Sequence, residues 1–110
     1  MLARPLRLHR PAEFRLVTRQ GRRVSEPGLV LHAHRADDAA TRVGFVVGKV
    51  VGPAVTRNRV RRRLQHLLAA RLNQLPAGAR LVVRATATAA GRSSAALAES
   101  LDRALAKAYP

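Results

Sequence analysis

The chain has 110 residues, 47% of them hydrophobic, which fits one folded domain with a modest core and excludes a disordered tail. Lysine and arginine number 21 against 6 aspartate and glutamate residues, so the formal net charge is +15. Such an excess predicts a polyanionic partner, either nucleic acid or an anionic membrane surface. The chain has no cysteine, which excludes disulfides and thiolate chemistry and suits the cytoplasm, where we expect it to act.

We predict no transmembrane helix, because no apolar run approaches the roughly 18 residues that such a helix needs. The basic start, MLARPLRLHRP, lacks the apolar core of a signal peptide. The sequence shows no internal repeat and no linker. We therefore expect a single domain over residues 1–110.

The first predicted helix begins at Pro11, which fits a first helical turn, and ends at Gly21. Phe14 and Val17 are three residues apart and would share one face. A short edge strand at 22–25 and two longer strands follow. The longer strands cover 29–34 and 42–48. The turn formers in RADDAAT between them predict that these two pair as an antiparallel hairpin.

An amphipathic helix is predicted after Gly52 and Pro53. Its apolar residues recur at helical spacing: Val60, Leu64, Leu67, Leu68, Leu72 and Leu75. Arg59, Arg62 and His66 fall on the opposite side, whereas Arg57 and Arg61 project near the apolar stripe. Arg71 projects into the stripe, where we expect its aliphatic stem to pack while its charged end reaches water.

The segment PAGA at 76–79 ends this helix, and a valine-rich strand at 80–86 follows. Ser93 or Ser94 is then the predicted N-cap of a last helix, whose apolar face carries Leu97, Leu101 and Leu105. This order predicts an α/β (α+β) two-layer sandwich with helices packed on a small mixed sheet of about four strands.

We predict no catalytic residue and no metal site in the chain itself. The histidines are His9, His32, His34 and His66. His32 and His34 alternate on a strand and share a face, so they are either an acid and base for RNA cleavage or polar residues of a surface or cleft. No cysteine or acid accompanies them at a metal-ligand spacing, which excludes a metal-binding motif of that kind.

The run RNRVRRR at 57–63 has five arginines in seven positions, and no acidic residue lies between Ala39 and Ala98. A helix start attracts phosphate because its first N–H groups are unpaired and the helix dipole is positive there. Arginine grips phosphate at two points, and Asn58 can donate and accept at once. The alternatives are a solvated basic face and a helix lying on a membrane.

Nucleic acid is the favoured partner, because the helix has the strands to cover its apolar face and carries no aromatic membrane anchor. Aromatic residues make up only 3% of the chain. Recognition by base stacking needs more exposed rings, so we expect backbone contacts to a folded RNA.

The segment RVGFVVGKVVGPAVTRNRVRRRL at 42–64 resembles the signature of the bacterial ribonuclease P protein component. The matching residues are Lys49, Gly52, Ala54, Val55, Arg57, Asn58, Arg59, Val60, Arg61, Arg62, Arg63 and Leu64. The segment AEFRLVTRQG at 12–21 also resembles the first helix of this family.

The resemblance implies a left-handed β-α-β crossover through the arginine-rich helix, the opposite of the usual hand. It also implies a protein subunit of ribonuclease P. Its partners would be the catalytic ribonuclease P RNA and precursor tRNA, with no membrane and no further protein required. The RNA, with Mg²⁺ bound mainly by the RNA, would cut off the 5′ leader to make mature tRNA ends.

The resemblance also implies which residues bind. RNA-binding residues would be Arg57, Asn58, Arg59, Arg61, Arg62, Arg63 and Lys49. A leader cleft between the sheet and the first helix would include Phe14, Thr18 and His32. Thr18 and His32 stand where the family often has aromatic residues, so we expect leader affinity to depend more on charge than on stacking.

One alternative is a structural RNA-binding protein of ribosomal type. Composition and charge do not separate it from ribonuclease P, but the Arg-Asn-Arg motif favours ribonuclease P.

Overall fold

The computed structural model describes residues 6–8 and 10–110, so His9 and the chain before Leu6 lie outside the described residues. The helices are α1 (Pro11–Gln20), α2 (Ala54–Ala69) and α3 (Ser94–Ala108). The strands are β1 (Arg22–Glu26), β2 (Leu29–Arg35), β3 (Arg42–Val46) and β4 (Ala79–Ala85). The short 3-10 turns within the described residues include η2 (Lys49–Val51), η3 (Leu72–Gln74) and η4 (Ala89–Gly91).

The strands form one mixed sheet in the order β1-β2-β4-β3. β4 pairs antiparallel with β2 and parallel with β3. The predicted hairpin of β2 with β3 is therefore wrong, because β4 lies between them. β4 takes this central place because Leu81, Val82 and Val83 are all buried, and a strand that is apolar on both faces needs neighbours and cover on every side.

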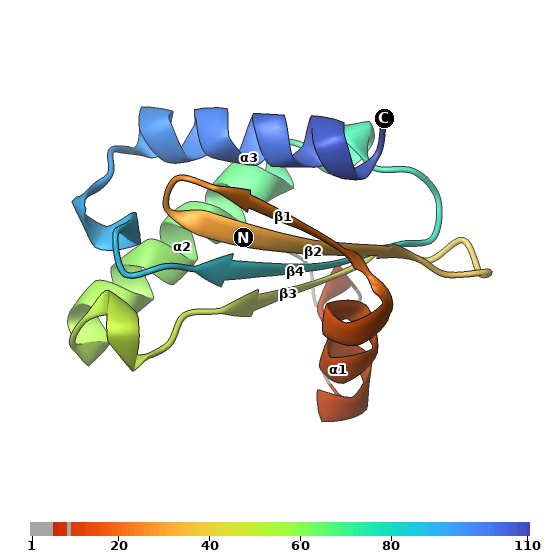
Figure 1. Ribbon diagram of the computed structural model, residues 1–110, viewed down its shortest axis with the longest axis horizontal. Coiled ribbons are helices and arrows are strands. Elements are labelled where there is room, and N and C mark those ends of the chain that lie inside the picture. Colours follow the sequence, from red (N-terminus) through yellow and green to blue (C-terminus); the bar gives the residue numbers. More distant parts are fainter. Residues whose placement is uncertain (1–5, 9) are drawn as a thin grey trace.

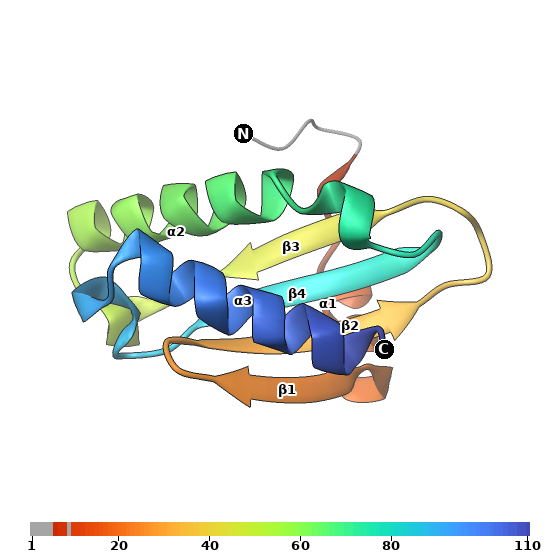
Figure 2. The same cartoon turned by 90° about the horizontal axis from the view of Figure 1, so that it is seen from above.

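The connection from β3 through α2 to β4 is a left-handed crossover, as the resemblance implied. In Figure 2, α2 and α3 lie in front of the sheet, and β3 and β4 both run from right to left. The chain passes from β3 through α2 and then down to β4, which is the uncommon hand for parallel strands.

Helices cover the sheet unequally. α2 and α3 pack on one face, and α1 packs on the other (Figure 1). The fold class is the predicted α/β sandwich on a four-stranded mixed sheet, with α1 on the face opposite the other two helices. The main core lies under α2 and α3. Its buried members include Leu29, Leu31, Val43, Val60, Leu64, Leu68, Leu81, Val83, Leu101 and Leu105.

α1 lies on a single row of the sheet. Val17 packs with Val82 in a second, small core, and Phe14 borders that core. The Phe14 ring lies directly over Gly44, where an added Cβ would be 2.4 Å from the ring. Gly44, Val82 and His32 are neighbours across β3, β4 and β2, so this row is the base on which α1 lies.

The polar anchors of the helices differ in part from the prediction. Ser93, one of the two residues predicted, is the N-cap of α3, and its Oγ accepts a hydrogen bond from the Ala96 N–H at 3.1 Å. Arg71 does not simply extend to water: its Nε donates to Asp102 Oδ1 on α3 at 2.6 Å, and its Nη1 donates to the Leu67 carbonyl. The carboxylate of Asp102 on α3 therefore holds the guanidinium of Arg71 in place.

Candidate nucleic-acid interface

The first turn of α2 has no side chain that offsets its positive charge. Its N-cap is Pro53, which offers no side-chain cap, and its first turn has no acidic residue. The first intrahelical bond runs from the Arg57 N–H to the Pro53 carbonyl at 2.9 Å. The N–H groups of Ala54, Val55 and Thr56 therefore have no intrahelical partner. The helix dipole is positive at this end, so it repels the arginine side chains. The uncapped start of α2 therefore favours binding of an anion.

The five arginines of α2 spread around the helix. Arg59 and Arg62 are exposed and, with Val55 and Asn58, line a groove on its outer side. Arg61 is half-buried and donates from Nη1 to Asn58 Oδ1 at 3.1 Å, which orients the amide.

Two arginines point elsewhere. Arg57 is half-buried, and its enclosed Nε has no hydrogen-bond partner. Arg63 is half-buried and donates from Nη1 to the Arg92 carbonyl at 2.9 Å. Arg57 and Arg61 therefore project near the core, as the sequence predicted. The five arginines of α2 thus face more than one surface of the protein.

The carboxylates of Glu26, Asp38 and Asp102 pair with cations elsewhere. The ion pairs join Arg71 to Asp102, Arg80 to Asp38, and both Arg103 and Lys107 to Glu26. Within residues 6–8 and 10–110, no arginine between 57 and 63 has a carboxylate partner. The positive charge of these arginines is therefore not compensated by carboxylates in the part of the chain that the structure describes. Lys49 is exposed on η2, which contacts α2, and adds to this end of the molecule.

The three residues expected in a leader cleft lie on or beneath α1. Phe14 is half-buried with its ring against Gly44. Thr18 is half-buried, and its Oγ1 donates to the Arg15 carbonyl at 3.1 Å. His32 is only 5% exposed, and neither ring nitrogen has a hydrogen-bond partner. The structure thus groups all three, but His32 lies at the base of α1 and not on an open surface.

Burial lowers the pKa of His32, and the positive charges of Arg84 and Arg23 lower it further. The ring is therefore neutral at neutral pH. A neutral, enclosed imidazole cannot stack on a base, and it is poorly placed to exchange protons with a substrate.

Sequence reasoning missed the cationic residues beside α1. Arg84 is exposed on β4, between Val30 on β2 and Val46 on β3 in the next row of the sheet. Arg23 is exposed on β1, opposite His32. The period-2 alternation of Arg80, Val82 and Arg84 could have shown that arginines face the same side as the buried valine.

Among the described residues, no three His, Cys, Asp or Glu side chains lie close enough to hold a metal ion. In the same part of the chain, none of the helices is long and apolar enough to cross a membrane.

These features define a small, strongly basic α/β protein of the RNA-binding class. A family model described as Ribonuclease P matches residues 2–109. The ribonuclease P protein component of Acidothermus cellulolyticus is 47% identical over 109 residues, covering 97% of this chain and 91% of the relative. That of Streptomyces bikiniensis is 46% identical over 114 residues, covering 96% and 93%.

Solved structures agree on the fold. The RNase P protein of Staphylococcus aureus has a TM-score of 0.84 at 23% identity, covering 96% of this chain and 98% of that one. The RNase P protein of Thermotoga maritima has a TM-score of 0.81 at 21% identity, covering 92% and 96%. The chain belongs to the ribonuclease P protein family. It is the protein subunit of the ribonuclease P holoenzyme, an endoribonuclease that processes the 5′ ends of tRNA.

Proposed function

We propose that residues 1–110 form one RNA-binding domain that holds the catalytic ribonuclease P RNA through the start of α2. The observation that carries this proposal is the group of five arginines with no carboxylate partner in the described chain. RNA phosphates would offset the repulsion among these side chains, and the free N–H groups of the first turn would add directional donors. Lys49 and Asn58 complete this proposed contact surface.

We also propose that the 5′ leader of precursor tRNA lies on the sheet face beside α1. Of the three residues proposed for this surface, Phe14 would supply the aromatic ring, since His32 is enclosed and Thr18 has no ring. Arg23 and Arg84 supply positive charge on the same face. Leader binding in this arrangement depends chiefly on the phosphate backbone.

The chemistry of cleavage is assigned to the RNA. Mg²⁺ bound by the RNA would supply the activated water and stabilise the leaving oxygen. We propose no magnesium ligand and no catalytic residue in this chain. The role of the protein is to bind and position RNA, in the cytoplasm and without a further protein. Cleavage by His32 and His34 alone has less support, because His32 is buried and neutral.

Salt-dependent binding of the catalytic RNA tests the contact at α2. Arg59→Ala should weaken binding and lower the slope of log affinity against log salt by about one, because one phosphate contact is lost. Arg35→Ala is the matched control: it also removes one exposed arginine, but at the end of β2, where Arg35 donates to the Ala77 carbonyl. Equal effects of the two substitutions would show that only net charge matters and would overturn the assigned site.

A further inference from the structure

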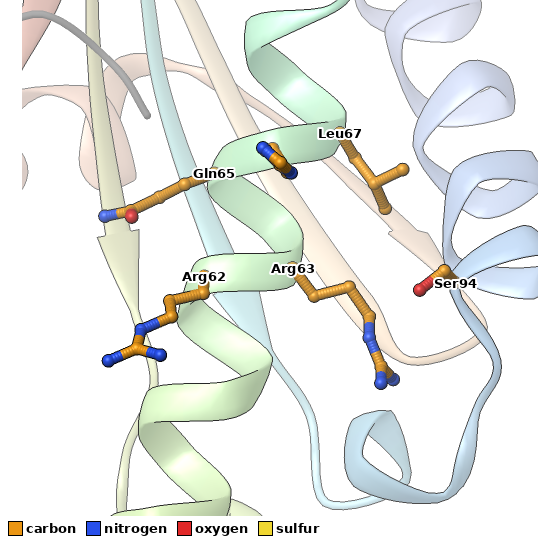
Figure 3. A pocket seen from close by; sticks show the side chains of 6 residues that line it. Arg62, Arg63, Gln65, Leu67 and Ser94 are labelled. Carbon is orange, nitrogen blue, oxygen red and sulfur yellow. The ribbon is translucent and has the colours of Figure 1, made fainter.

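A second groove lies on the side of α2 that faces α3. It has a volume of about 500 Å³, and its lining residues are Arg62, Arg63, Gln65, His66, Leu67 and Ser94. Figure 3 shows Arg63 and Leu67 pointing from α2 toward the start of α3, where Ser94 lies. Arg62 and Gln65 point to the other side of the helix. Leu67 is the apolar residue of the lining, and the polar lining residues come from the two helices.

Arg63 and Ser94 bring groups to this groove that can bind an anion. Arg63 uses Nη1 for the Arg92 carbonyl, and its remaining guanidinium N–H groups have no carboxylate partner in the described chain. Exposed Arg62 and His66 also line the groove, but the Arg62 side chain points to the other side of α2 (Figure 3). The Ser94 hydroxyl can donate, and no acidic residue stands in the first turn of α3.

The first turn of α3 begins at Ser94, a lining residue of this groove, and carries backbone donors. Ser93 Oγ satisfies the Ala96 N–H, and the Ser93 carbonyl accepts from the Leu97 N–H. The N–H groups of Ser94 and Ala95 have no intrahelical partner. Arg63 of α2 and the start of α3 therefore bring donors close together from two different elements.

This groove is separate from the one assigned to the catalytic RNA above. That outer groove is lined by Val55, Asn58, Arg59 and Arg62, so Arg62 is the one residue that the two share. Arg63 and Asn58 thus serve different sides of α2.

We infer that the α2–α3 groove binds the phosphate backbone of a second segment of RNA, apart from the segment at Asn58 and Arg59. α2 then lies between two RNA segments, as at a junction of strands, instead of along one strand. This inference rests on the proposed function, because it assumes that α2 binds RNA.

Ser94→Asp separates an RNA contact from a structural role. A carboxylate in the first turn of a helix interacts favourably with the positive end of the helix dipole. The variant should therefore melt at the same temperature as the wild type or higher. The same carboxylate would repel a phosphate in the groove, so affinity for the catalytic RNA should fall about tenfold. Asn73→Asp, which adds the same charge at exposed η3, is the control and should bind almost as the wild type does. Unchanged affinity in the Ser94→Asp protein would overturn the inference.

Arg63→Ala and Arg59→Ala distinguish failure of this inference from failure of the proposed function. Both single variants should lower the salt slope by about one, and the double variant should lower it by about two. A loss for Arg59→Ala with none for Arg63→Ala would overturn the second segment alone. No loss for either would overturn the proposed function as well.

Directed cleavage of the RNA identifies the segments. The chain has no cysteine, so a single cysteine can carry an iron chelate that generates hydroxyl radicals. Val55→Cys marks the outer groove and Ala95→Cys marks the α2–α3 groove, and both positions are exposed. The inference predicts that, in the assembled holoenzyme, the two probes cut segments far apart in the RNA sequence. Cuts confined to one continuous segment would contradict it, as would an absence of cuts from Ala95→Cys.

Discussion

Gly44 shows how one residue positions the proposed leader surface. A side chain at this position would meet the Phe14 ring, which lies against the backbone of β3. The absence of a Cβ therefore lets α1 approach the sheet closely. Because the small core under α1 has few members, this single contact has a large share in holding the helix.

Gly44→Ala should displace Phe14 and lower the free energy of unfolding by about 1–3 kcal/mol, the usual cost of overpacking a tight site. Gly48→Ala is the matched control, since a Cβ there meets nothing within 4 Å. Chemical denaturation of both variants measures the difference. If Gly44→Ala were as stable as Gly48→Ala, the close packing of α1 on β3 would be contradicted.

Helical spacing predicted which side chains of α2 face the core, but it did not predict which residues they bind. The spacing of the apolar residues predicted that Arg57 and Arg61 would lie near the core, and both are half-buried. The same spacing placed Arg71 in the apolar stripe without showing its partner, Asp102, which lies 31 residues along the chain. Such a pairing depends on how α2 and α3 pack, and neither helix reveals that alone.

At the scale of elements, one carboxylate joins β1 to α3. Glu26 on the edge strand accepts from Arg103 Nε at 2.8 Å and from Lys107 Nζ at 2.7 Å. Its side chain is only 7% exposed, whereas both cations are largely exposed. The hydrogen bonds from Arg103 and Lys107 lower the pKa of Glu26 below its ordinary value.

The lowered pKa gives Glu26 a pH-dependent share in stability. The contribution is complete above the pKa of the unfolded chain, near 4.5, and is lost as the pH falls through the lower pKa of the folded state. Glu26→Gln should therefore melt below the wild type at neutral pH, and the gap should close in acid. Glu99→Gln, at an exposed position of α3, is the control, and its melting temperature should stay close to that of the wild type at every pH. A constant gap for Glu26→Gln from pH 7 to pH 3 would contradict the account.

The elements themselves were largely predictable, and their order in the sheet was not. Proline, glycine and serine marked the ends of helices at Pro11, Gly21 and Ser93, as their backbone and capping preferences dictate. The turn formers after β2 suggested a local hairpin, but β4 pairs with β2 from far along the chain. Local turn chemistry does not record that distant competition. The buried valines of β4 on both faces were the clue to its central position.

At the scale of the whole molecule, charge is divided between two regions. Among the described residues, the ion pairs involve α3, β1, β4 and the segments that follow β2 and α2, whereas the arginines at the start of α2 have no carboxylate partner. Ligands that bind the native state alone stabilise it by mass action. Anions should therefore act on this protein as partial substitutes for RNA.

Sulfate or phosphate should raise the melting temperature of the free protein by several degrees, because either would bind at the start of α2. Sodium chloride at matched ionic strength controls for screening of the net charge. Thermal melts that coincide in sulfate and chloride would contradict an anion site. An Arg57→Ala, Arg59→Ala protein should lose most of the extra stabilisation by sulfate.

The proposed leader surface makes a separate prediction. The affinity gained from the leader, taken as the ratio of precursor-tRNA binding to leaderless tRNA binding, should fall steeply with salt, since few rings are available for stacking. Thr18→Phe supplies a ring at the edge of α1 and should add a gain that salt affects little. A ratio that stays flat in the wild type as salt rises would show that stacking, not charge, holds the leader.

The central claim is that this chain supports cleavage by binding RNA through the arginines of α2. The most direct test is cleavage of precursor tRNA by the cognate catalytic RNA at low magnesium, with and without the purified protein. We predict strong rescue by the wild type and by Arg35→Ala, little by the Arg57→Ala, Arg59→Ala protein, and no cleavage by the protein alone. Rescue that survives the double substitution would contradict the assigned site, and no rescue by the wild type would contradict the function.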